Sequence, residues 1–510
     1  MSEKPVFPEI AADVHDFDEL AECRCTMLVR LCRYVIACAE KNETIQRNPL
    51  SVYVQESRRS EEFFDAYGAK HNTYWGPFRE IIAAAKFASN VLYMALHLKY
   101  AAPYYHLFPV EGDFLGATDS AVAILTDLLV DVSRALIETG RKAGLTIPTD
   151  RYNEFCPEEE YPRFFMPWDT GTRTNPDAGR TVVNIATAFL NQVESSGIIG
   201  TFRAVQERSL QDCVPDLLSE RQLRRYENEF HNLQAIYDTA LTGTDTERDD
   251  PDLPYLRGHI TAVFHLLEIA TAVGHYQERH VRFCSDEGRP RQFLAEDRAR
   301  SLLVDYSLDY VVRYLDRARA LCRTLLQRYA EIAEIEVPVP TYRGFHVRPS
   351  SLVAKIVRHY GTSVTMELDD EICDAASAMD IIRLNEKIYA IKRRRLAEDV
   401  TTVAEQVKGD DLMPVFLRLL EEKKIVLYSG NLYLEDFPRV EGESLPEYAN
   451  RGIARLLATG KIDIRSDIHV TLHGDIRVLE DLRILATHGY GEDSMGNNVT
   501  LPADLNYLRR

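Results

Sequence analysis

Apolar residues recur every three or four positions through most of the first 335 residues, and this spacing predicts helices that bury one face. The segments in which the pattern is clearest are Leu20–Ala39, Phe78–Leu98, Ala121–Ile137, Arg180–Val205, Glu220–Leu241 and Leu256–His275. Convincing alternation of apolar and polar residues is absent there, and the breaks between helices are polar and rich in proline. Residues 1–335 are therefore predicted to form a large all-α domain.

The longest regular stretch of this region runs from Val304 to Ile332. Its apolar residues alternate four- and three-residue spacings, which predicts one apolar seam along a single long helix. Such a seam fits a helix that packs against other helices of the chain, and it also fits a dimeric coiled coil. We favour packing within the chain, because the flanking charges are mostly arginines and do not alternate in sign.

The pattern changes at Val337–Pro340, where two prolines beside valines end the helix and favour extended backbone. Beyond this point two strand-like pieces, Thr362–Leu368 and Ile468–Leu472, alternate with helical ones. A separate piece, residues 389–465, lies between these strands. It carries the basic run Lys392–Arg395, a predicted helix at Leu412–Leu420, and a predicted hairpin of Ile425–Tyr428 with Leu432–Leu434 around Ser429-Gly430-Asn431.

Composition narrows the class of protein. The chain has 510 residues, of which 45% are hydrophobic and 27% charged, so a mostly disordered chain is excluded. Its net charge of −19 argues against a protein that acts mainly on nucleic acid or on an anionic membrane. The most apolar stretches, Ile81–Tyr105 and Phe114–Ile137, carry too many charges for membrane insertion, and the first residues lack the pattern of a signal peptide. We expect a soluble cytoplasmic protein whose nine cysteines are reduced thiols.

One short segment, Gly344–Ser351 (GFHVRPSS), carries a specific chemical pattern and precedes an amphipathic helix. Pro349 is tolerated at a helix start, so His346 is predicted to lie just before the helix N-terminus. Free backbone N–H groups and the positive end of the helix dipole attract anions there, and a histidine that merely caps the helix is the alternative. We expect a nucleophilic His346 that accepts a phosphoryl group, with Arg348 and Val347 as phosphate-binding residues.

This segment resembles the active-site segment of HPr, the histidine-containing phosphocarrier of the bacterial sugar phosphotransferase system, whose signature is Gly-Leu-His-Ala-Arg-Pro-Ala. Gly344, His346, Arg348 and Pro349 match the determining positions of that signature. The resemblance implies that His346 carries the phosphate on a ring nitrogen and that Arg348 holds and releases it. It also implies an open-faced β-sandwich, in which three helices cover one face of a four-stranded antiparallel sheet.

Two later segments are similar to the rest of the family pattern. Residues 374–379 (DAASAM) resemble the start of the family's second helix. By this resemblance Ser377 falls on a serine that a regulatory kinase modifies in some members, and Met379 falls on an apolar contact used for partner docking. Residues 467–492, which end in Gly-Tyr-Gly-Glu, look like the family's last strand and helix and its closing Gly-Phe-Gly-Glu.

The sequence therefore predicts an α+β multidomain chain in which an insertion splits the HPr-like domain. The predicted parts are an all-α domain (1–335), the first part of the HPr-like domain (336–388), an α/β insertion (389–465), the second part of the HPr-like domain (466–494) and a C-terminal tail (495–510). The resemblance implies a phosphocarrier in a phosphoenolpyruvate-dependent relay, with an enzyme I-like donor and a protein acceptor. Such a protein carries a group rather than turning over a small molecule, needs no cofactor, and would act in regulation through its helical domain.

Two other functions stay open. In the first, the HPr-like domain is a docking or regulatory module that is phosphorylated but passes nothing on. In the second, the helical domain binds a metal or another ligand through a cluster of histidines and glutamates: His231, Glu229, His259, His265, Glu268, His275, Glu278 and His280. We expect no metal there, because the paired Glu-x-x-His repeats of di-iron bundles are absent.

Two further patterns have plain structural explanations. Cys23, Cys25, Cys32 and Cys38 fall on one predicted helix, so we expect small buried side chains rather than a zinc site. The basic run and the helix-plus-hairpin pattern of residues 389–465 would also suit a DNA-binding winged helix. We favour a solvated helix face for the basic run, because the chain is acidic and a second recognition helix is not evident.

Overall fold

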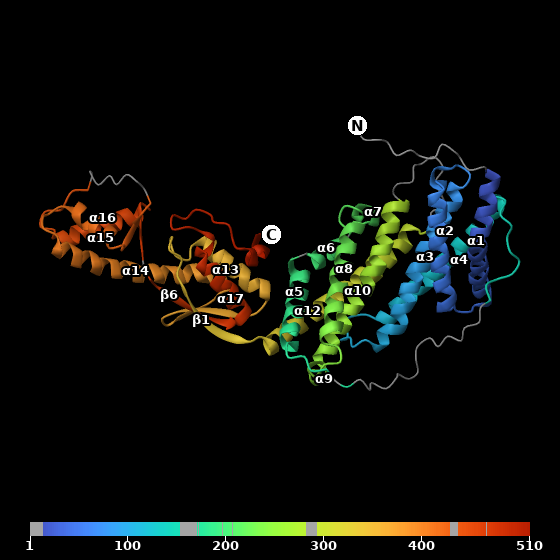
Figure 1. Cartoon of the computed structure of the whole chain (residues 1–510), viewed down its shortest axis with the longest axis horizontal. Helices are drawn as coiled ribbons and strands as arrows, with labels where there is room; N and C mark the ends of the chain where they lie inside the picture. The colour runs from blue at the N-terminus through green and yellow to red at the C-terminus, as the bar shows by residue number, and fades with distance from the viewer. Residues whose placement is uncertain are drawn as a thin grey trace. The chain divides into compact units, whose positions relative to one another are not determined.

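The computed structural model describes residues 14–153, 171, 173–195, 197–206, 208–281, 293–428, 437–465 and 467–509. The chain divides into two compact units (Figure 1). The first unit comprises Met1–Thr181 and Ala188–Cys322, and the second comprises Val182–Thr187 and Arg323–Arg510. The named elements of the first unit are all helices, and the second unit adds an antiparallel sheet, so the predicted α+β class is confirmed.

The first unit is built around long amphipathic and apolar helices. Its helices, with α12 extending into the second unit, are α1 (Val14–Lys41), α2 (Arg47–Ala66), η1 (Ala69–His71), α3 (Gly76–Ala101), η2 (Ala102–Tyr104), α4 (Phe114–Lys142), α5 (Ala178–Ser195), α6 (Ile198–Gln206), α7 (Leu210–Cys213), α8 (Glu220–Ala240), α9 (Asp245–Asp249), α10 (Asp252–Tyr276), η3 (Gln277–Val281), α11 (Glu296–Arg300), η4 (Ser301–Leu308) and α12 (Asp309–Tyr329).

The helices predicted from periodicity are present, with two differences. The predicted helix Arg180–Val205 is two helices, α5 and α6, because Gly197 between them adopts a left-handed conformation with φ +67°. Helix α2 was not predicted, since its buried face includes Glu56, Ser57 and Glu61 and gives a weak apolar pattern. Hydrophobicity alone therefore located the most apolar helices and missed one whose buried face is partly polar.

Helix α3 is the most apolar helix of this unit. The segment Gly76–Tyr104 is long and apolar enough to cross a membrane by length and composition, and 72% of its most apolar window is buried inside the protein. It packs against α2, α4 and α10. Its hydrophobicity is thus used by the packing of the helical unit itself.

The predicted apolar seam is also used within the chain. Its residues Val304, Leu308, Val311 and Leu315 are fully buried, as packing inside one chain requires. The seam does not run to Ile332, which is 56% exposed and begins a strand. The prediction of helix up to residue 335 is wrong for these last residues, because from Ile332 onward outward-facing residues alternate with inward-facing ones.

The second unit combines a four-stranded sheet with helices and a two-stranded insertion. Its elements after α12 are β1 (Ile332–Pro338), α13 (Val347–Tyr360), β2 (Val364–Leu368), β3 (Glu371–Asp374), α14 (Ala378–Gln406), α15 (Leu412–Glu421), β4 (Ile425–Leu427), α16 (Leu445–Ala458), β5 (Ile462–Ile464), β6 (His469–Asp475), α17 (Ile476–Thr487), η5 (Gly489–Gly491) and η6 (Ala503–Arg509). The large sheet has the order β1-β6-β2-β3, and every neighbouring pair is antiparallel.

One face of this sheet forms a core with three helices. Val337, Met366 and Leu472 from the sheet pack in one apolar cluster with residues of α13, of the first half of α14 and of α17. Figure 1 shows α13 and α17 beside β1 and β6. The expected sheet of four antiparallel strands is confirmed. Strand β6 lies between β1 and β2, so chain segments on both sides of residues 389–465 build a single core.

Helix α14 runs without a break across the predicted boundary at residue 389. Ile388 belongs to the sheet core, and Leu396 belongs to a second core that α14 forms with α15, α16, β4 and β5. The predicted hairpin differs from the observed pairing, because β4 pairs with β5. The turn 429–431 and the strand Leu432–Leu434 of that prediction lie outside the described residues.

The predicted tail is part of the sheet core. Leu501, Leu505 and Leu508 pack in the same apolar cluster as α13 and α17. Residues 495–509 therefore contribute apolar contacts to the core rather than trailing from it.

Candidate functional site

His346 is the N-cap residue of α13, as the sequence predicted. The residue before it, Phe345, is fully buried and packs edge-on against Tyr490 at a ring-centroid distance of 5.3 Å. The Phe345 carbonyl oxygen accepts a hydrogen bond of 2.8 Å from the Ser350 hydroxyl. Buried Phe345 precedes His346 and helix α13 follows it. These two neighbours fix the position of the His346 backbone and so of its imidazole.

Two consecutive left-handed residues turn the chain into this position. Arg343 has φ +49° and Gly344 has φ +56°. Asn385 of α14 holds both ends of the turn, because its Oδ1 accepts from the Phe345 N–H at 2.9 Å and its Nδ2 donates to the Arg343 carbonyl at 3.2 Å. A Cβ on Gly344 would lie 2.2 Å from Asn385 Oδ1, so this position requires glycine for both conformation and space.

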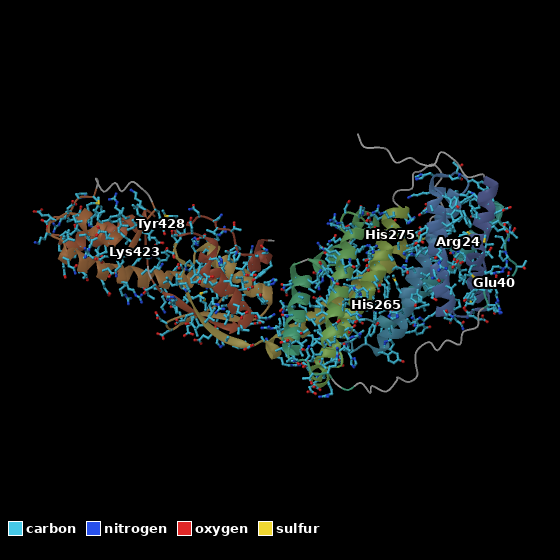
Figure 2. The ribbon with its side chains drawn as sticks, viewed as in Figure 1. Arg24, Glu40, His265, His275, Lys423 and Tyr428 are labelled. Carbon is cyan, nitrogen blue, oxygen red and sulfur yellow. The ribbon has the colours of Figure 1, made fainter. Side chains whose placement is uncertain are left out.

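The insertion holds the same turn from another side. Asp463 of β5 is buried, and its Oδ2 accepts hydrogen bonds from the Arg343 N–H at 2.8 Å and from the Tyr428 hydroxyl at 3.1 Å. The Tyr342 ring packs edge-on against both His346, at 5.5 Å, and Tyr428, at 5.0 Å. Tyr428, labelled in Figure 2, follows β4, so β4 and β5 both contribute to the environment of the His346 loop.

Donors for an anion are available at the start of α13. The His346 side chain makes no capping hydrogen bond, and the backbone N–H groups of Val347 and Arg348 have no partner among the described residues. The Arg348 side chain is 38% exposed. Val347 is available through its backbone only, because its side chain is apolar and 71% exposed.

A carboxylate from the end of the domain faces these donors. Glu492 Oε2 lies 3.3 Å from His346 Nε2, and Glu492 Oε1 lies 3.8 Å from Arg348 Nε. The Glu492 side chain is only 6% exposed, and its Oε2 makes no hydrogen bond with the described residues. Glu492 follows η5, where Tyr490 is fixed by a hydrogen bond of 2.7 Å from its hydroxyl to the Pro338 carbonyl. A carboxylate of the protein therefore lies beside the donors at the start of α13.

Burial disfavours charge on both partners. It lowers the pKa of His346, the positive charge of Arg343 lowers it further, and Asp463 opposes the shift. Burial raises the pKa of Glu492, and Arg348 opposes that shift. At neutral pH the imidazole of His346 is thus mainly uncharged, which is the form with a nucleophilic lone pair.

The other two residues of the predicted site lie at the start of α14. Ser377 is the N-cap of that helix, and its hydroxyl oxygen accepts from the Asp380 N–H at 3.3 Å. Met379 is 62% exposed. Neither residue contacts His346 within the part of the chain that the structure describes, so the structure brings together His346, Arg348 and Val347 and leaves Ser377 and Met379 apart.

Sequence reasoning missed the residues that hold the loop and fill the anion site. Glu492 ends the Gly-Tyr-Gly-Glu segment, and that segment was the available signal for it. The sequence around Asn385 and Asp463 carried no such signal. Nothing in it indicates contact with a loop that lies 40 and 120 residues away, respectively.

Within the described part of the helical unit, three histidines lie beside carboxylates and His259 lies beside a backbone carbonyl. His259 is fully buried, and its Nδ1 lies 2.7 Å from the Tyr255 carbonyl oxygen. The other pairs, of which His265 and His275 are labelled in Figure 2, are His265 with Glu268 at 2.7 Å, His275 with Glu220 at 3.0 Å and His280 with Glu80 at 3.3 Å. Among the described residues no three His, Cys, Asp or Glu side chains gather as a metal site would need.

The predicted helix with four cysteines buries three of them. Cys25, Cys32 and Cys38 are buried, Cys23 is exposed, and each is a free thiol. The basic run lies in α14, where Lys392 is buried and the next three arginines are exposed.

Comparison with known proteins finds no match to the chain among protein families, curated proteins or solved structures.

We predict that Gly344→Ala destabilises the second unit by about 2–4 kcal/mol, because alanine is strained at positive φ and its Cβ would displace Asn385 from two hydrogen bonds. Urea unfolding followed by circular dichroism measures the change. Gly200→Ala in α6 is the control, since Gly200 has open space around its Cβ and lies in a helix. Equal unfolding midpoints for the two variants would contradict the conclusion that Asn385 and a glycine at position 344 stabilise the turn.

We also predict that His346 is half-protonated at a pH below the ordinary histidine value of ~6.5. Because the folded-state pKa is lowered, protonation favours the unfolded chain, and this group's contribution to stability is lost as the pH falls from the unfolded value through the folded one. Ring-proton NMR shifts give the midpoint, and His346→Ala assigns the signal. Arg343→Gln should raise the midpoint, and a wild-type midpoint at or above the ordinary value would refute the assignment.

Proposed function

We propose that the sheet and helices of the second unit form an HPr-like phosphocarrier domain split by an insertion, and that His346 accepts a phosphoryl group. The observation that carries the proposal is the start of α13, where an uncharged, 26% exposed imidazole adjoins unpartnered backbone N–H groups and the Arg348 guanidinium. The core built from segments on both sides of residues 389–465 supports it, because the resemblance requires those segments to belong to one domain.

The chemistry needs only the imidazole and a phosphorylated donor. The lone pair of one ring nitrogen attacks phosphorus, the bond from phosphorus to the donor atom that carries it breaks, and that atom leaves with the electron pair. The other ring nitrogen keeps its proton. Since Nε2 faces the Glu492 carboxylate, the proton is favoured on Nε2 and the lone pair on Nδ1. Nδ1 is buried in this conformation, so the ring must rotate to meet a donor.

The phosphoryl group would be held by the groups already aimed at this position. The N–H groups of Val347 and Arg348 and the positive end of the α13 dipole favour its negative charge, and the Arg348 guanidinium offers further donors. Onward transfer is the same reaction in reverse, with an acceptor in place of the donor. We propose an enzyme I-like donor and a protein acceptor, as the resemblance implies, and a cytoplasmic location.

A docking protein would find exposed apolar side chains near the two helix starts. Val347 and Met379 are both more than half exposed. We keep Ser377 as a proposed regulatory phosphorylation site, where the phosphate would sit at the positive end of the α14 dipole beside the repelling carboxylate of Asp380.

The contacts from Asp463 and Tyr428 favour a second candidate, in which phosphorylation of His346 is read by the insertion and is not passed on. Transfer to a sugar-specific acceptor protein separates the two functions. Phosphate that leaves His346 only by hydrolysis would favour the regulatory module.

We predict that incubation with phosphoenolpyruvate and enzyme I labels the wild-type protein with acid-labile, base-stable phosphate, and that His346→Ala abolishes the label. The matched control is His473→Ala, because His473 is exposed on β6. The control should label like wild type. Equal labelling of His346→Ala and wild type would remove the site.

Replacing the carboxylate that faces the site should favour the phosphorylated form. Glu492→Gln removes a negative charge beside the incoming phosphoryl group, and we expect the phosphorylation equilibrium to shift about tenfold toward the labelled protein. The equilibrium ratio of labelled to unlabelled protein at fixed donor and product concentrations measures it. Glu480→Gln on the exposed side of α17 is the control, and a loss of labelling in Glu492→Gln alone would show that the carboxylate assists the reaction instead.

A further inference from the structure

A groove of about 850 Å³ lies between α14 and α16 and adjoins the loop that carries His346. Its apolar lining comes from both helices and from β5. The lining includes the charged residues Arg343, Arg393 and Asp463 and the aliphatic residues Leu396, Ile453 and Leu457. This volume is in the range of small-molecule sites, and the mixture of aliphatic walls with a few polar groups is typical of them.

The polar groups of the groove have an excess of positive charge. Arg343 and Arg393 make no ion pair within the described residues, and Arg343 Nη2 lies about 3.0 Å from where a Cβ on Gly460 would be. Arg393 lies over the Tyr389 ring at 5.9 Å. Arg343 likewise lies over the Tyr342 ring at 5.2 Å, so each guanidinium group contacts a ring but has donors left to bind an anion.

Among the described residues the lining holds one acid, Asp463, against two arginines, so a net positive charge remains. Asp463 Oδ2 already accepts from the Arg343 N–H and the Tyr428 hydroxyl, and its Oδ1 accepts from the Ile464 N–H at 2.7 Å. Its carboxylate is thus committed to the backbone of the loop and of β5. The groove therefore offers the donors of two arginines together with aliphatic side chains.

We propose that this groove binds a small organic anion, a phosphate or carboxylate with an apolar body, through Arg343 and Arg393. The apolar body would contact the aliphatic side chains of Leu396, Ile453 and Leu457. A nucleic-acid backbone is polar and has no group that matches these side chains.

The site is connected to His346 by short covalent and hydrogen-bonded paths. Arg343 lies three residues before His346, in the left-handed turn. An anion that binds the Arg343 guanidinium would therefore change the charge near the imidazole. Asn385, Tyr389 and Arg393 follow one another at four-residue spacing on α14, which places the clamp of the turn and the wall of the groove on one helix face. An effect of the ligand on phosphorylation rests on the proposed function, whereas binding itself does not.

The experiment uses anilinonaphthalene sulfonate, an apolar body with one anionic group, and N-phenylnaphthylamine, which lacks the sulfonate. Fluorescence titration of the full chain gives both affinities. Arg393→Gln should weaken sulfonate binding about tenfold, the loss of one charge-assisted contact, and leave the neutral probe unchanged. Arg394→Gln is the matched control, because Arg394 is exposed on the same helix and does not line the groove.

Further variants separate the outcomes. Ala454→Trp should fill the groove and abolish binding of both probes, with circular dichroism confirming the fold. Binding that survives in Ala454→Trp, or is weakened equally by Arg393→Gln and Arg394→Gln, overturns the proposal. A DNA duplex that displaces the sulfonate overturns it in favour of nucleic acid. His346→Ala should bind the sulfonate as wild type does, so a failed phosphorylation assay and a failed groove remain distinguishable.

Discussion

The position of His346 depends on a left-handed turn that the chain would not adopt on its own. Arg343 is strained at positive φ, and Gly344 supplies the second left-handed residue without strain. The turn persists because Asn385 and Asp463 together hold three of its backbone polar groups. These hydrogen bonds fix the backbone just before α13, and with it the position of the imidazole at the helix start. The candidate chemistry therefore rests on contacts made far along the chain.

The sheet explains how so large an insertion is tolerated. Strand β6 must return between β1 and β2 to complete the core, so the chain can leave and re-enter at any point where its ends stay close. Helix α14 provides that exit, since it is anchored by Ile381 and Ile388 in the sheet core and continues without a break to Leu396 in the insertion core. A continuous helix holds the two cores in a fixed relation, because its backbone hydrogen bonds fix every residue relative to the next. A loop would lack these hydrogen bonds.

Local patterns predicted the local features well. Helix α13, its N-cap histidine and strands β2 and β6 follow from proline placement, helical periodicity and alternation, all of which act within about ten residues. The errors have physical causes of longer range. Strand β1 was assigned to helix because Ile332 also continued the apolar seam of α12, and only pairing with β6 decides between the two. Glu492 and Asp463 became site residues through burial and packing, which no local pattern encodes.

Electrostatics connects these features. A chain of net charge −19 has to concentrate positive charge locally if it is to hold an anion at all. Positive groups lie at two neighbouring places, the start of α13 and the groove beside α14, and Arg343 acts on His346 and lines the groove. At the start of α13 the carboxylate of Glu492 faces the donors. In the groove, Asp463 accepts hydrogen bonds from backbone N–H groups, and the guanidinium groups make no ion pair among the described residues. An anion bound at either place would change the field at the other, so the turn at Arg343 would link the two proposed sites through charge as well as through geometry.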